Sequence, residues 1–216
     1  MRRIEKRKRV CYLIAMNEKF YDLSKEKQDR MLNGAMQVFA LYGYRHASTD
    51  EMVKAVGVSK GLWFHYFDSK KGLYHSVCSY AIRYMLMEVS IQIGDGEKDY
   101  FALREKLESA KMSLVDKYPY LPLIIQSVLK ETDEEAIEVA GDIRQQYIDK
   151  IQEIYEISDR SIFADSNEAR YVTEMLDASF ENKLWECYLA PVFSKQNYLD
   201  GIHNYIEIIK KVVQNH

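Results

Sequence analysis

Residues 48–67 read STDEMVKAVGVSKGLWFHYF, and this stretch decides how the rest of the chain is interpreted. Ser48 with a glutamate three residues later is a capping box, which predicts a helix that starts at Thr49. Gly57 predicts the end of that helix, because glycine adopts the left-handed conformation of a helix C-terminus without a side-chain penalty. Ser59 can cap a second helix. The stretch therefore predicts two short helices separated by a tight turn.

Each of these helices has an apolar face at three- and four-residue spacing. The face consists of Met52, Val53 and Val56 in the first helix and of Leu62, Trp63, Tyr66 and Phe67 in the second. Helix, glycine turn and helix form the helix-turn-helix arrangement, which places its second helix in the major groove of DNA. On spacing alone the pattern also fits an ordinary helical hairpin.

The residue types are more specific than the spacing. Residues 59–74, SKGLWFHYFDSKKGLY, resemble the signature of the TetR family of bacterial repressors. The shared features are the Ser-Lys-Gly helix start, the aromatic-His-Tyr-Phe run and the Ser-Lys pair that opens the next helix. With Gly43-Tyr44 and Ala47-Ser48-Thr49 upstream, the similarity covers residues 25–74. The resemblance implies an all-α fold, in which a three-helix DNA-binding head is joined by a long helix to a C-terminal helical domain for ligand binding and dimerisation.

The resemblance also implies which residues meet DNA. Thr49 would offer its hydroxyl and backbone N–H to a phosphate. Lys60 and Gly61 lie at the start of the reading helix, where the helix dipole favours anions. Lys70, at the start of the following helix, would neutralise another phosphate. The complete expected set is Thr49, Ser59, Lys60, Gly61, Leu62, Phe64, His65, Tyr66 and Lys70.

Two of these residues, Leu62 and Phe64, have side chains without hydrogen-bonding groups. Leu62 has no hydrogen-bonding group, so we expect it to touch a base edge such as a thymine methyl. Phe64 stands where a tyrosine is common in the family, and a phenyl ring cannot donate a hydrogen bond to phosphate. Trp63 and Phe67 are assigned to the core of the head.

Composition agrees with a helical, water-soluble chain. Among 216 residues there are only 3 prolines and 9 glycines, which favours long helices and few turns. No apolar run approaches the ~20 residues that a membrane-spanning helix needs. The three scattered cysteines, Cys11, Cys78 and Cys187, suit a reducing cytoplasm better than a disulfide framework. We therefore expect a cytoplasmic protein without a membrane segment.

The net charge of −3 hides an asymmetry. Residues 1–71 contain 15 basic and 8 acidic residues, a balance of +7, and the remainder of the chain carries −10. An N-terminal part that meets phosphates is expected to show this distribution. Residues 1–15 alone contribute +5, however, so the charge is weaker evidence than the motif.

The N-terminal residues allow three interpretations. Residues 1–9 contain six basic side chains, which suit a flexible arm that reaches a minor groove or phosphates. They equally suit a solvated tail. Met16 is an alternative start of the protein, in which case residues 1–15 would be absent from it.

Further helices are expected at 24–41, 69–93, 100–117, 120–131, 134–157, 167–189 and 197–213, and no internal repeat is present. They give three parts: an N-terminal extension (1–23), a DNA-binding domain (24–84) and an effector-binding and dimerisation domain (85–216). The helix at 69–93 would link the last two parts mechanically. Helix pairs at the end of the chain pack against a second copy in the TetR family, so we expect a homodimer. The apolar residues expected at its interface are Val172, Leu176, Phe180, Ile202, Tyr205, Ile206 and Ile209.

The C-terminal part is expected to hold a pocket for an apolar or amphipathic effector. Its expected lining consists of aromatic and methionine residues, each of which also suits ordinary core: Tyr84, Phe101, Met112, Tyr118, Tyr147, Tyr155, Met175 and Trp185. No metal-ligand spacing, nucleophile elbow or phosphate-binding glycine loop occurs, so we expect neither cofactor nor enzymatic activity. The leading hypothesis is a repressor released from a palindromic operator by its effector. An activator or an effector-independent regulator with the same fold is the alternative.

Overall fold

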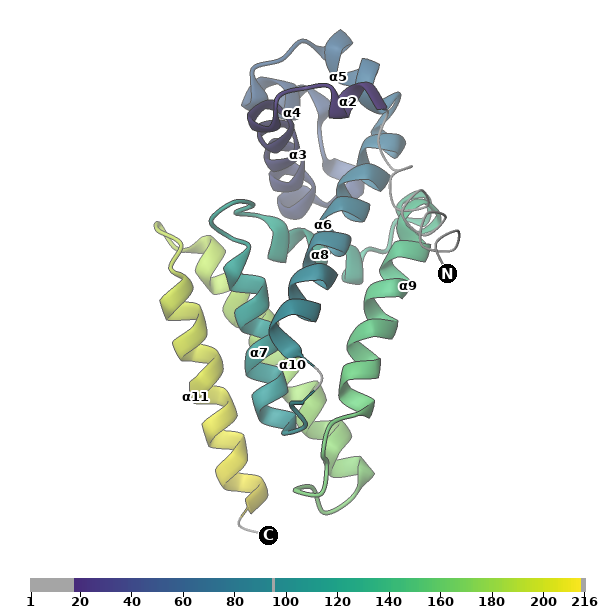
Figure 1. The fold of residues 1–216 in the computed structure, drawn as a ribbon. Helices are drawn as coiled ribbons and strands as arrows, with labels where there is room; N and C mark the ends of the chain where they lie inside the picture. The colour runs from purple at the N-terminus through teal and green to yellow at the C-terminus, as the bar shows by residue number, and fades with distance from the viewer. Residues whose placement is uncertain (1–17, 95, 215–216) are drawn as a thin grey trace. The chain divides into compact units, whose positions relative to one another are not determined.

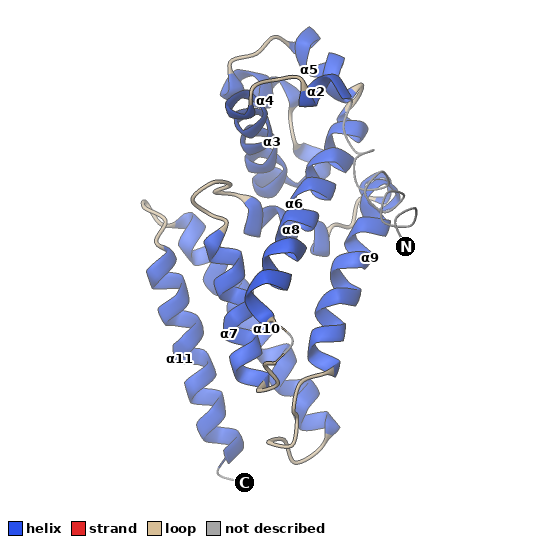
Figure 2. Ribbon diagram, viewed as in Figure 1, coloured by secondary structure: helices blue, strands red, loops and turns tan. Residues whose placement is uncertain are grey.

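The structure is a computed structural model of the chain, and it describes residues 18–94 and 96–214. The basic segment 1–9, most of the expected extension and Met16 lie outside the described residues. All regular structure within them is helical, which confirms the predicted all-α class (Figures 1 and 2). The helices are α2 (Glu18–Tyr21), α3 (Lys25–His46), α4 (Thr49–Val56), α5 (Lys60–Phe67), α6 (Lys70–Ile93), α7 (Tyr100–Ser113), α8 (Leu121–Lys130), α9 (Glu134–Glu156), α10 (Ser166–Leu189) and α11 (Lys195–Gln214).

Every helix expected from the sequence is present, and two helix ends differ by more than two residues from the expected position. The sequence predicts a helix that stops before Gly43, whereas α3 extends to His46 with a backbone break at Gly43, where φ is +66°. The sequence also predicts a helix up to residue 117, whereas α7 ends at Ser113. Turns replace its last residues ahead of Pro119, whose ring cannot continue a helix. The short helix α2 is not expected from the sequence.

The chain folds as two compact units. Unit 1 comprises residues 1–84 and 116–147, and unit 2 comprises residues 85–115 and 148–216. The end of the expected DNA-binding domain coincides with the first of these boundaries. Helix α8 and the first part of α9 also belong to unit 1, although they come from the segment expected to form the C-terminal domain. The functional domain boundaries stay a prediction.

Unit 1 is built around α3, against which α4 and α8 pack. One apolar stripe of this helix is buried, and it includes Met31, Ala35, Val38 and Phe39. The ring of Phe39 lies 4.9 Å from that of Tyr74 on α6 and 6.4 Å from that of Tyr44. This core provides the base on which the two short helices of the head are held.

Unit 2 contains α7, α10 and α11 together with the last turns of α6 and α9. Its core includes an aromatic group in which the Tyr100 ring lies 5.2 Å from Phe101 and 5.1 Å from Phe163. Arg104 is also buried there, and its guanidinium donates to the Tyr155 hydroxyl at 2.5 Å and to the Asp177 carboxylate at 2.6 Å. These partners offset the cost of burying a charge in an apolar core.

None of the helices in residues 18–94 and 96–214 is both long and apolar enough to cross a lipid bilayer.

Candidate nucleic-acid interface

The helix-turn-helix begins and ends where the sequence predicts. The Ser48 hydroxyl accepts a hydrogen bond from the backbone N–H of Glu51 at 3.4 Å and caps α4. Gly57 ends that helix in the left-handed conformation, with φ at +72°, and its N–H donates to the Val53 carbonyl at 2.9 Å. The Ser59 hydroxyl then accepts from the N–H of Leu62 at 3.2 Å and caps α5. Side chains encoded within this short stretch therefore set both helix starts.

Helix α5 is anchored by one face. Trp63 is fully buried and Phe67 is almost so, which confirms their expected assignment to the core. Tyr66 is buried on the same side. Phe20 from α2 packs against Phe67 and Tyr66, and its ring centroid lies 5.3 Å and 6.0 Å from theirs. The short helix α2 therefore completes the core beneath α5.

The opposite face of α5 is accessible to solvent. Lys60, Gly61 and His65 are exposed, and Leu62 and Phe64 are partly exposed. A Cβ atom built at Gly61 meets nothing within 4 Å, so the backbone is open to close approach there. The structure thus brings five of the expected DNA-contacting residues onto one accessible side of a short helix, at and just after its N-terminus. A helix N-terminus presents unpaired N–H groups and a positive dipole end, which favour phosphate.

Lys60 has a partner on the neighbouring helix. Its ammonium lies 2.7 Å from the Asp50 carboxylate, at the start of α4, and both side chains are largely exposed. Thr49 precedes Asp50 as the first residue of α4 and is partly exposed. The N-termini of α4 and α5 therefore lie next to each other, joined by this ion pair.

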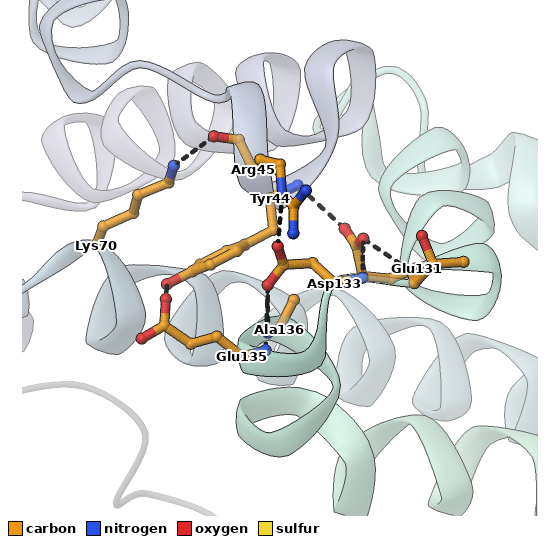
Figure 3. Close-up of polar contacts among 8 residues, drawn as sticks. Tyr44, Arg45, Lys70, Glu131, Asp133, Glu135 and Ala136 are labelled. Carbon is orange, nitrogen blue, oxygen red and sulfur yellow. Dashed lines mark hydrogen bonds and ion pairs between the residues drawn. The ribbon is translucent and has the colours of Figure 1, made fainter.

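Two of the residues expected to contact DNA, Tyr66 and Lys70, interact with other parts of the chain. Tyr66 is 8% exposed, so its ring belongs to the core, as its place on the apolar face of the sequence pattern also indicates. Lys70 donates to the Arg45 carbonyl at 3.2 Å (Figure 3), and its ammonium lies 4.9 Å from the centroid of the Tyr44 ring. In this arrangement Lys70 bonds within the chain at the end of α3. A phosphate contact by either residue stays a prediction.

The arrangement matches a known family of regulators. Residues 31–77, which include most of α3, both short helices and the start of α6, match the model described as "Bacterial regulatory proteins, tetR family". The N-terminal part of the chain belongs to the TetR family. The resemblance inferred from residues 25–74 is therefore confirmed, and the matched segment contains all of the expected DNA-contacting residues.

Two relatives from Bacillus subtilis are described as HTH-type transcriptional regulators. The HTH-type transcriptional regulator YuxN is 26% identical over 135 residues, which is 61% of this chain and 46% of YuxN. The HTH-type transcriptional regulator YerO is 33% identical over 57 residues, 26% of this chain and 20% of YerO. The match therefore spans less than half the length of each of these relatives.

A solved structure shows a similar fold over most of the chain. A TetR family transcriptional regulator from Chloroflexus aurantiacus superimposes with a TM-score of 0.61, covering 93% of this chain and 97% of that one. The two sequences are 19% identical, so this likeness establishes the TetR fold and extends it to the C-terminal helices beyond the matched family segment.

The residues expected to line an effector pocket are divided between the two units. Tyr84, Tyr118 and Tyr147 belong to unit 1, and the others belong to unit 2. Within unit 2, Phe101 and Met112 are buried, Tyr155 is bonded to Arg104, Trp185 is partly exposed and Met175 is 56% exposed. Tyr118 instead donates a hydrogen bond to Asp29 of the head at 2.5 Å. A pocket stays a prediction.

The residues expected at a dimer interface lie mostly inside the protomer. Val172, Leu176, Phe180, Ile202 and Ile206 are buried within the single chain, while Tyr205 and Ile209 are partly exposed. The same two helices carry a separate set of exposed apolar side chains: Tyr171, Met175, Leu189, Ile208 and Val212. Helical spacing identified the apolar stripes, but it did not distinguish the stripe that packs internally from the one left accessible.

Sequence reasoning missed several residues that hold the head in place. Phe20 was one, and its only signal was an aromatic pair, Phe20-Tyr21, within a polar stretch. Asp29 and Glu131 were others, and both bond to residues about ninety positions away in the sequence. No local pattern marks partners at such separations.

Among the described residues, no group of three or more histidine, cysteine, aspartate or glutamate side chains lies close enough to hold a metal ion.

Proposed function

We propose that this TetR-family protein is a DNA-binding transcriptional repressor that binds a palindromic operator as a homodimer and is released by a small apolar or amphipathic effector. The observation that carries the DNA-binding part is the accessible face of α5. Lys60, Gly61 and His65 lie on it, while Trp63 and Phe67 anchor the opposite face.

In the proposed complex the N-terminus of α5 enters the major groove. Lys60 and the open backbone at Gly61 approach phosphates, and Leu62 contacts the methyl group of a thymine. Thr49, at the adjacent N-terminus of α4, holds a neighbouring phosphate. Phosphate contacts of this kind fix the position of the helix, and base contacts select the sequence.

Dimerisation follows from the size of the reading element and from the exposed apolar residues of α10 and α11. One helix-turn-helix reads too few base pairs for a specific site, and a two-fold dimer reads two half-sites. Tyr171, Met175, Ile208 and Val212 are each more than half exposed in the single chain. Exposed apolar groups on one pair of helices suit an interface between two copies.

Release by an effector requires a binding site for the effector in the C-terminal helical domain and a conformational change that reaches the DNA-binding head. Unit 2 offers buried aromatic residues together with the polar pair of Arg104 and Tyr155, surroundings that suit a molecule with an apolar body and a polar end. Helix α6 starts beside α5 and continues into unit 2, so its displacement would alter the pose of the reading helix.

Selection of duplexes from a random library by the full-length protein tests the DNA-binding proposal. We expect an inverted repeat to be enriched and bound at least ~10³-fold more tightly than unrelated DNA. Leu62→Ala should relax the preference at one base pair of each half-site, whereas Leu41→Ala, a change of the same kind at an exposed position of α3, should not. Binding without sequence preference would refute the proposal.

The effector part is tested separately. Thermal denaturation of the protein with a panel of apolar and amphipathic compounds should identify a ligand that raises the melting temperature, because a ligand of the native state stabilises it. That compound should weaken binding to the selected duplex. A ligand that strengthens operator binding would point to an activator, and a panel without any hit would favour an effector-independent regulator.

A further inference from the structure

The core of unit 2 encloses a charged side chain. Arg104 on α7 is 1% exposed, and burying a guanidinium is costly unless acceptors and a counter-charge surround it. Aromatic rings lie over it, with the central carbon of the guanidinium 4.9 Å from the centroid of Phe180 and 5.2 Å from that of Tyr155. In such apolar surroundings a positive charge attracts an anion more strongly than it would in water.

The acid that neutralises Arg104 is far less enclosed than Arg104 itself. Asp177 on α10 accepts from Nη2 of Arg104 at 2.6 Å, and its side chain is 53% exposed. The buried acid Glu108 has other partners, since it pairs with Lys111 at 2.6 Å and accepts from the Tyr198 hydroxyl at 2.6 Å. Among the described residues, Arg104 therefore takes its counter-charge from a carboxylate that can turn into solvent at little cost.

The bond to Asp177 uses only part of one edge of the guanidinium. Nε and Nη2 present parallel N–H bonds on this edge, which can hold both oxygens of a carboxylate. Asp177 places one oxygen on Nη2, whereas Nε is buried and has no hydrogen-bond partner in the part of the chain that the structure describes. Nη1 donates elsewhere, to the Tyr155 hydroxyl. A carboxylate that met the edge with both oxygens would satisfy one donor more than Asp177 does.

We propose that the effector is a carboxylic acid with an apolar body, and that its carboxylate binds the Nε–Nη2 edge of Arg104 in place of Asp177. This inference rests on the proposed release by an effector, and it adds the chemical class of the effector and the residue that recognises it. Arg104 selects the negative charge, and the rings of Tyr155 and Phe180 beside it suit an apolar body.

The exchange of one carboxylate for another favours an acid over neutral and cationic compounds. When an acid replaces Asp177, the guanidinium keeps a counter-charge, and the Asp177 carboxylate is released into water. A neutral compound in the same place would leave a buried charge without a counter-ion, and a cation would add a second positive charge. The apolar area that the body of the acid buries then supplies the net binding free energy.

Binding of paired ligands to the full-length protein tests the inference. Decanoate and 4-butylbenzoate have apolar bodies of different shape, and each is compared with its primary amide, which keeps the shape and removes the charge. Isothermal titration calorimetry at neutral pH measures the affinities. We expect an acid to bind at least ~10-fold more tightly than its amide, the scale of a hydrogen bond to a charged group.

Three substitutions in unit 2 separate recognition from stability. Asp177→Asn should raise the preference for acid over amide by at least ~5-fold, because the buried guanidinium is then left without a counter-charge until an acid binds. Arg104→Met replaces the charge with an apolar side chain and should abolish the preference. Asp200→Asn changes the net charge as Asp177→Asn does, at an exposed residue of α11, and should behave like the wild type. A purely structural role of Arg104 would weaken acid and amide alike and leave their ratio unchanged.

Two results would overturn the inference: acids that bind no more tightly than their amides in both pairs, or an acid preference that survives Arg104→Met. If Arg104→Met does not fold, Asp177→Asn decides, and an unchanged preference in that variant would refute the displacement of Asp177. The proposed function is judged separately, by the effect of the bound compound on operator affinity. A neutral compound that binds and releases the operator would refute this inference and support the effector proposal, whereas a panel without any hit would refute release by an effector.

Discussion

At the scale of single residues, the ion pair of Lys60 with Asp50 links the two helix N-termini that we assign to DNA. Both side chains are more than half exposed, so the pair contributes little to stability. The ion pair matters more for DNA binding. A phosphate must compete with Asp50 for the Lys60 ammonium, and the negative charges of Asp50 and the phosphate repel each other. Asp50 therefore sets a limit on the affinity for DNA.

Asp50→Asn should raise the affinity for the selected duplex by about 2–5-fold, the scale of an exposed ion pair. Fluorescence anisotropy at two salt concentrations measures the effect, which should be larger at low salt. Glu174→Gln breaks the exposed ion pair with Arg170 on α10 and changes the net charge equally, so it serves as the control. Equal effects of the two substitutions would mean that only net charge matters.

The partly buried hydrogen bond between Tyr118 and Asp29 affects the pKa of the Asp29 carboxyl. Burial raises the pKa of this carboxyl, but the hydrogen bond from Tyr118 and the ion pair with Lys25 lower it more, so the pKa lies below its usual value of 3.8. The unfolded chain therefore takes up this proton at a higher pH than the folded one. The stabilisation is fully present above the unfolded pKa and is lost as the pH falls through the folded pKa.

Asp29→Asn should lower the free energy of unfolding by about 1–2 kcal/mol at pH 7, because it removes a charged acceptor from a partly buried bond. The difference from the wild type should shrink as the pH falls below about 4. Denaturant unfolding at pH 7, 5 and 3 measures both effects. Asp22→Asn, an exposed aspartate of the same unit, provides the comparison, and a difference independent of pH would contradict the assignment.

At the scale of secondary structure elements, α5 depends on a cap that also lies at the proposed DNA surface. The Ser59 hydroxyl accepts from the N–H of Leu62, and the residue itself is exposed. Its role in stability and its role in binding are separable, because aspartate caps a helix as well as serine does but carries a charge that repels phosphate.

Ser59→Ala should lower the free energy of unfolding by about 1 kcal/mol through loss of the cap. Ser59→Asp should keep the wild-type stability and nevertheless bind the selected duplex more weakly than Ser59→Ala does. Thermal unfolding and anisotropy titrations on the same preparations compare the two. If Ser59→Asp bound DNA like the wild type, Ser59 would be a cap without a place at the interface.

At the scale of the whole molecule, the exposed apolar residues of α10 and α11 bear on assembly. In the single chain the expected interface residues Leu176 and Ile206 are buried, so they cannot meet a second copy without unpacking the protomer. Met175 and Ile208, which are 56% and 59% exposed, present their apolar groups to solvent. These are the side chains that a partner would cover.

Met175→Arg should convert a dimer into monomers, because it places an unpaired charge in the proposed interface. Met87→Arg introduces the same charge at a methionine that is 50% exposed on α6 and should leave the dimer intact. Light scattering during size-exclusion chromatography measures both. Met175→Arg should also bind the operator more weakly, because a monomer reads only one half-site. If both variants formed dimers as stable as those of the wild type, the interface would lie elsewhere.

The sequence by itself determined the helical class, the helix-turn-helix and the assignment of Trp63 and Phe67 to its core. These features depend on contacts within a few residues, such as the caps at Ser48 and Ser59 and the left-handed turn at Gly57. Only the tertiary structure decided that α8 packs with the head, that Tyr118 bonds to Asp29, and which apolar stripes of α10 and α11 face inward. Such choices depend on which surfaces meet, and helical periodicity shows that a face is apolar without showing what covers it.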